Sequence, residues 1–118
     1  MSQLICWLLV GLVHLIPALA LVRPALITRL YGVAPDSPLF LLMHHRAALF
    51  FAVLVACVWA AFDPGGRKLA ALLAAISMLG FLFLYQSYGR PAALTTIALV
   101  DLIGLIPLAW AGWHAFQQ

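Results

Sequence analysis

A few ionisable side chains lie inside long apolar runs, and they are the residues best suited to chemistry: His14, His44, His45, Arg46 and Asp101. An imidazole beside a carboxylate can take up and deliver a proton, while the carboxylate orients the ring. Asp101 and His45 therefore form the predicted catalytic pair. We expect His14 and Arg46 to orient a substrate beside them.

Other polar side chains lie near the ends of the same apolar runs. With His14 and Arg46, they complete the predicted substrate-binding set: His44, Tyr85, Gln86 and Thr95. The alternative is a metal or haem held by the imidazoles of His14, His44 and His45. No metal-binding spacing such as HExxH occurs, so no metal ligand is assigned and the sequence leaves the cofactor unknown.

Composition places these groups in a membrane. Of 118 residues, 67% are hydrophobic and 8% are charged, against about 45–50% and about 25% in ordinary soluble domains. The six Lys and Arg residues are scattered and form no basic stripe, which argues against nucleic acid as a partner. The sequence therefore predicts a lipid bilayer as the main partner.

The apolar runs predict an all-α fold, a single integral membrane domain over residues 1–118. Each run is near the roughly 20 residues that cross a bilayer, and backbone groups in lipid must be satisfied within a helix. A short interfacial helix is expected over 24–31, before Gly32. Ser37-Pro38 and Asp63-Pro64 each predict a helix boundary, with a capping side chain followed by proline. Short connections predict an antiparallel four-transmembrane-helix bundle, with helices at about 4–22, 39–62, 69–88 and 92–113.

The polar groups fall in one half of this bundle, toward the first and third connections. His14 and Asp101 lie roughly 13–15 Å from that face, at the usual helical rise. We expect a one-sided polar cavity that binds a small lipophilic molecule, and acid–base transformation of that molecule is one reading. The alternative is a non-catalytic ligand carrier or a partner subunit, so enzymatic activity stays open, as does a homo-oligomer.

Small residues suggest which helix faces meet. Stripes of Gly and Ala let helices approach closely. Asp101 shares such a stripe with Ala98 and Gly104, and His45 shares one with Ala48 and Ala52. This favours His45 over His44 as the inward-facing histidine. Toward the opposite face, the four tryptophans read as an aromatic belt at the membrane interface: Trp7, Trp59, Trp110 and Trp113.

Positive charge favours one membrane orientation. Most Arg residues lie near the first and third connections, whereas the second carries only Arg67 and Lys68. The positive-inside rule then places both termini on the non-cytoplasmic side. The expected location is a bacterial inner membrane.

The chain resembles an uncharacterised family of small four-helix bacterial integral membrane proteins, itself similar to the DoxX-like proteins, in VHLIP at 13–17, LYGV at 30–33, HHRA at 44–47 and the single Asp101. The resemblance implies a four-helix bundle with polar positions at His14, Arg46 and Asp101. Some members carry the label phosphopantetheine adenylyltransferase. FDP at 62–64 echoes that enzyme, but RKL at 67–69 stands where its paired-histidine motif belongs, so the residues do not support that activity.

Overall fold

The computed structural model describes residues 2–117, which form five α-helices and two short 3₁₀ helices. No strand occurs within these residues, so the predicted all-α class is confirmed. The elements are α1 (Ser2–Leu19), α2 (Ala25–Tyr31), α3 (Pro38–Phe62), η1 (Pro64–Gly66), α4 (Arg67–Ser87), η2 (Ala92–Leu94) and α5 (Thr95–Ala115).

Three helical stretches are long and apolar enough to cross a membrane: Pro38–Phe62, Pro64–Ser87 and Ala92–Ala115. Their mean hydropathies are 1.9, 2.0 and 2.1, and their outward side chains are largely Leu, Ile, Val and Phe. These features fit a membrane protein. The first run is shorter than expected, because α1 ends at Leu19 and tight turns follow, in which the Ala20 and Leu21 amides bond to carbonyls three residues back.

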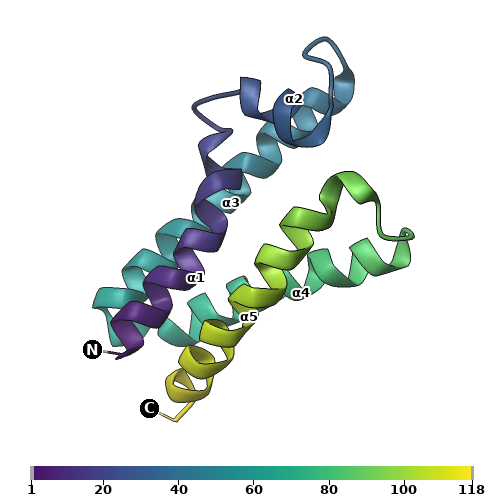
Figure 1. Cartoon of the computed structure of the whole chain (residues 1–118). Coiled ribbons are helices and arrows are strands. Elements are labelled where there is room, and N and C mark those ends of the chain that lie inside the picture. The colour runs from purple at the N-terminus through teal and green to yellow at the C-terminus, as the bar shows by residue number, and fades with distance from the viewer. Residues whose placement is uncertain (1, 118) are drawn as a thin grey trace.

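The helices form a bundle in which α1 packs against α3 and α5, while α4 packs against α5 and α3. Figure 1 shows the start of α1 and the end of α5 at the same end of the molecule. The short helix α2 lies at the opposite end, beyond the start of α3 (Figure 1). Polar residues near the first connection and near the α4–α5 turn therefore belong to the half of the bundle away from the termini.

The predicted helix boundaries at Ser37, Asp63 and Gly32 are confirmed. The Ser37 hydroxyl accepts a hydrogen bond from the Leu39 amide at 3.2 Å, and Asp63 accepts one from the Gly65 amide at 2.9 Å. Both residues precede a proline, which suits the first helical position because it has no N–H to satisfy. Gly32 ends α2 with φ of 69°, a left-handed conformation that glycine adopts without a Cβ clash.

Replacing Ser37 with alanine should lower the free energy of unfolding by about 1 kcal/mol, because the first turn of α3 loses its capping acceptor. Thermal unfolding in mild detergent measures the effect. Ser87→Ala is the matched control, since the Ser87 hydroxyl donates to the Phe83 carbonyl at the end of α4 and caps no helix start. Equal shifts in the two variants would rule out a capping role for Ser37.

The core in the half near the termini is built from small side chains around Trp7. Alanines from α3, α4 and α5 pack there with Cys57, Met78 and Leu108. Trp7 is 0% exposed and its indole N–H has no hydrogen-bond partner among the described residues. Its predicted place in an interfacial belt is therefore wrong, because neighbouring alanines leave room for a large ring inside the bundle. Trp59, Trp110 and Trp113 do face outward.

Candidate functional site

A small cavity in the half away from the termini contains the best candidate site. Its volume is about 150 Å³, and it lies among α1, α2, α3 and α5. The walls are mostly apolar, with polar atoms supplied by Asp101, Thr96 and Tyr31. The lining residues are Leu12, Val13, Ile16, Pro17, Leu30, Tyr31, Phe50, Thr96, Ile97, Val100 and Asp101.

Asp101 is the buried carboxylate of this cavity, which we call the Asp101 pocket. Its side chain is 8% exposed and shares the inner face of α5 with Ala98 and Gly104, as the sequence predicted. The positive charge of Arg46 attracts this carboxylate. None of the side-chain hydrogen bonds found among residues 2–117 involves this carboxylate, which leaves it able to accept one from a bound molecule.

Arg46 projects from α3 toward α2 and is half-buried. One guanidinium nitrogen donates to the Tyr31 hydroxyl at 3.0 Å. The guanidinium carbon lies 4.4 Å from the centre of the Phe50 ring, 5.4 Å from that of Tyr31 and 5.9 Å from that of Phe81. Aromatic faces attract a cation through their quadrupoles, so these three rings hold the arginine in place.

His14 is a structural histidine in this arrangement. It is 1% exposed, with Nδ1 placed 3.0 Å from the Val10 carbonyl oxygen and Nε2 placed 3.1 Å from the Ser77 hydroxyl. A carbonyl can only accept, so Nδ1 donates, and the neutral ring then accepts the Ser77 proton at Nε2. Both ring nitrogens are occupied, and His14 does not line the Asp101 pocket.

His44 and His45 face opposite to the sequence prediction. His45 is exposed, whereas His44 is half-buried and its Nε2 lies 2.8 Å from the Leu21 carbonyl oxygen, to which it donates. The expected inward stripe through Ala52 is also wrong, because Ala52 is exposed and Ala47, Cys57 and Ala61 are buried. The structure therefore does not bring His45 and Asp101 together. The larger side chains Phe50 and Leu54 are partly buried on the same side of α3 as Ala47.

Tyr85, Thr95 and Gln86 lie at the α4–α5 connection rather than in the Asp101 pocket. The Tyr85 hydroxyl lies 3.1 Å from the Thr95 hydroxyl and links the two helices. Gln86 accepts a hydrogen bond from the side chain of Arg90 at 2.8 Å. The neighbouring Thr96 lines the pocket instead.

Three residues of the site were missed from the sequence: Tyr31, Phe50 and Thr96. Tyr31 belongs to the short helix α2, which was expected at the interface and without a role in a site. Phe50 lies four residues after Arg46, so the two side chains share one helix face. That spacing could have identified Phe50 from the sequence. Nothing in the sequence indicated that α2 packs against α3, so Tyr31 could not be found in the same way.

The metal and haem alternative finds no geometric support. Across residues 2–117, no group of three or more His, Cys, Asp or Glu side chains is arranged to hold a metal ion. His14 and His44 each bond to a backbone carbonyl, and His45 faces outward.

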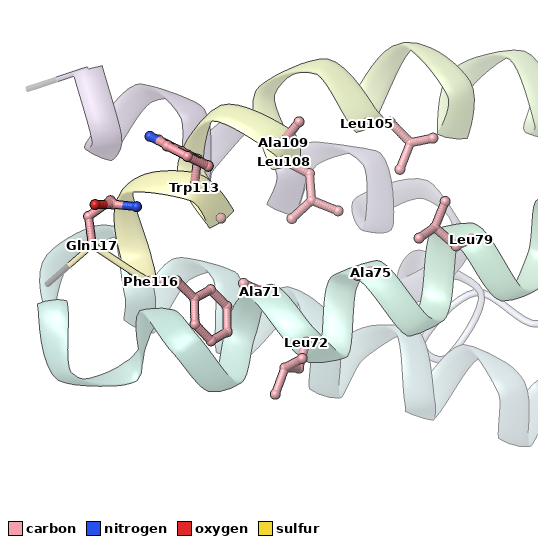
Figure 2. A pocket seen from close by; sticks show the side chains of 11 residues that line it. Ala71, Leu72, Ala75, Leu79, Leu105, Leu108, Ala109, Trp113, Phe116 and Gln117 are labelled. Carbon is pink, nitrogen blue, oxygen red and sulfur yellow. The ribbon is translucent and has the colours of Figure 1, made fainter.

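A larger apolar groove of about 610 Å³ lies between α4 and α5 near the chain termini. Figure 2 shows its walls, with Ala71, Leu72, Ala75 and Leu79 on α4 and Leu105, Leu108, Ala109 and Trp113 on α5. Phe116 and Gln117 close one end (Figure 2). No charged side chain lines it, so it can offer contact to hydrocarbon but no acid–base chemistry.

Comparisons with known proteins add no relative to this description. No family model, curated protein or solved structure matches the chain. The resemblance to small four-helix membrane proteins therefore stays a prediction from the sequence motifs. The function must be argued from the site itself.

Proposed function

We propose that the protein is a four-crossing antiparallel membrane bundle that binds a small lipophilic molecule in the Asp101 pocket. A single observation carries the proposal: one buried carboxylate lines a cavity whose walls are mostly apolar. Ionisable groups at membrane depth are costly and usually serve a site, and an apolar pocket with a few convergent polar groups is the usual form of a ligand site.

The fourth crossing in this proposal is α1. Its 18 residues are apolar apart from Ser2, Gln3 and His14, and it packs along α3 and α5, two of the three helices long enough to span. The proposed orientation places both termini outside the cytoplasm of a bacterial inner membrane. It is supported by Arg23, Arg29 and Arg90, which lie exposed near the first and third connections.

The ligand's size and polarity follow from the pocket. A volume of about 150 Å³ suits one ring rather than a fused ring system, since a cavity of about that size holds a benzene molecule. Asp101 can accept a hydrogen bond from a hydroxyl on that ring, as in a phenol or quinol. Leu12 and Ile16 line the pocket and are also exposed on the bundle surface, so an alkyl tail can leave between them into lipid.

The proposal is binding rather than acid–base transformation. The predicted chemistry needs Asp101 beside an imidazole that is free to exchange a proton, but His45 faces outward and His14 has both nitrogens engaged. A carrier, or the ligand-binding subunit of an oligomer, agrees with this arrangement.

Asp101→Asn should weaken binding of para-octylphenol about 10- to 100-fold, because a neutral amide oxygen accepts the phenol hydroxyl less strongly than a carboxylate does. Octylbenzene should bind the natural protein and the variant equally, since it has no hydroxyl to donate. Binding is measured in an uncharged detergent, and lipid mass spectrometry identifies any molecule that copurifies. Asp36→Asn, in the exposed first connection, is the matched control.

Ile97→Phe provides a second test. Ile97 lines the pocket, so the larger phenylalanine side chain should block binding of both probes. Thermal unfolding separates lost binding from lost folding in each variant. The pocket proposal fails if a folded Asp101→Asn protein binds para-octylphenol as tightly as the natural protein does.

A further inference from the structure

A second cavity lies between α3 and α4, and Phe50 separates it from the Asp101 pocket. Its volume is about 320 Å³, and its walls are Arg46, Leu49, Phe50, Val53, Leu73, Ile76 and Ser77. Phe50 lines both cavities, whereas Asp101 lines only the first. We call this second cavity the Arg46 groove.

Arg46 has donors to spare at this groove. A guanidinium carries five N–H groups, and within residues 2–117 its hydrogen bonding uses one nitrogen, toward Tyr31. Three aromatic rings hold the side chain without neutralising its charge. An arginine in such surroundings gains much from an anion that meets it with two parallel hydrogen bonds.

The groove changes polarity along its length. Arg46 lies eight residues into α3, roughly 12 Å along the helix axis, and its side chain reaches back to Tyr31 of α2. The other lining residues of α3 are Leu49, Phe50 and Val53, which lie further from α2. They face Leu73 and Ile76 of α4, so the groove has a cationic end near the first connection and an apolar remainder deeper in the bundle.

We propose that the Arg46 groove binds a single-chain anionic amphiphile, a long-chain carboxylate whose head pairs with Arg46 and whose alkyl chain lies between α3 and α4. This inference rests on the proposed placement of the chain in a membrane and goes beyond the ligand of the Asp101 pocket. A carboxylate fits better than a phosphate, because a single charge is less costly to remove from water at this depth.

Palmitate binding to the natural protein in uncharged detergent is the direct test, with methyl palmitate as the uncharged probe of equal chain length. Arg46→Gln should weaken palmitate binding about 30-fold, the usual size of a lost charge-assisted contact. Methyl palmitate should bind the natural protein and the variant alike. Arg29→Gln, at an exposed cation of α2, is the matched control and should leave palmitate binding unchanged.

Asp101→Asn separates this inference from the proposed function. Removing that carboxylate frees Arg46 from a competing charge, so palmitate should bind about threefold tighter, while para-octylphenol binding should weaken about 10- to 100-fold. Ile76→Trp should block palmitate by filling the groove from its exposed side, and it keeps the test open if Arg46→Gln does not fold.

Two results would overturn the inference. The first is equal binding of palmitate and methyl palmitate by the natural protein. The second is binding of palmitoyl lysophosphatidate as tight as that of palmitate, which would assign the groove to a phosphate-headed lipid instead.

Discussion

Gly104→Val is expected to destabilise the bundle by about 3 kcal/mol, the upper part of the range for overpacked cores. A Cβ at Gly104 would lie 2.7 Å from Met78 Cε and 2.7 Å from Val13 Cγ2. The Met78 methyl is the end of a flexible chain and can move, but β-branched Val13 is stiff about χ1. Gly104→Ala should therefore cost less, about 1–2 kcal/mol.

The measurement is thermal or denaturant unfolding in mild detergent. Gly80→Ala is the matched control, because a Cβ there meets nothing within 4 Å and alanine favours a helix over glycine. Adding Val13→Ala to Gly104→Ala should recover part of the loss, and the coupling between the two changes measures the contact. If Gly104→Ala and Gly80→Ala change the free energy of unfolding alike, α1, α4 and α5 do not approach one another closely at Gly104.

Gly104 also bears on the site, since it lies one helical turn from Asp101 on the same inner face of α5. Forcing α5 away from α1 at this point widens the Asp101 pocket, to which both helices contribute. We therefore expect Gly104→Ala to weaken para-octylphenol binding as well as stability. Sequence reasoning anticipated this face, because Ala98, Asp101 and Gly104 follow helical spacing on an apolar helix.

Local signals predicted the helices well. These signals involve residues that are neighbours in the chain, so they can be read directly from the sequence. They are the long apolar runs, the Ser-Pro and Asp-Pro pairs and the glycine after α2. The facing of α3 depends on which helices it meets. Ala48 and Ala52 looked like a contact stripe, yet α1 and α4 pack on the side that carries Ala47 and Cys57. This packing leaves His45 exposed and separates it from Asp101.

The Asp101 pocket was only partly predictable for the same reason. Asp101 could be identified from the sequence, because a lone carboxylate in an apolar membrane helix is energetically costly and usually serves a site. Tyr31 reaches the pocket only because α2 folds back beside α3 and η2, a contact between segments far apart in sequence. Trp7 likewise gave an interfacial signal by residue type, whereas its burial depends on the small residues of three other helices.

Arg67→Ala is expected to lower the free energy of unfolding by about 3 kcal/mol, because several charge-assisted hydrogen bonds are lost together. Arg67 Nε donates to the Ala60 carbonyl at 2.7 Å and one terminal nitrogen donates to the Ala61 carbonyl at 3.3 Å. These carbonyls belong to the last turn of α3, where a cation also complements the helix dipole. The other terminal nitrogen donates to the Gln3 side chain at 2.8 Å, which ties α1 to the α3–α4 turn.

Lys68→Ala is the matched control, since Lys68 is the neighbouring cation and is exposed. The free energy of unfolding in detergent should fall much further in Arg67→Ala than in Lys68→Ala. Gln3→Ala should show a smaller loss than Arg67→Ala, because it removes only the hydrogen bond between Arg67 and α1. Similar losses for Arg67→Ala and Lys68→Ala would contradict the capping role.

The same pair bears on membrane orientation. An arginine bonded to backbone carbonyls is held inside the fold, so of the two cations at the second connection only Lys68 is exposed. That connection then offers less free positive charge than its composition indicates, which supports termini outside the cytoplasm. Accessibility labelling of a cysteine introduced at Gln117, in a background with Cys6 and Cys57 replaced, should mark it from the non-cytoplasmic side in the natural, Arg67→Ala and Lys68→Ala forms alike. Labelling from the cytoplasmic side would reverse the proposed orientation while leaving the cap on α3 intact.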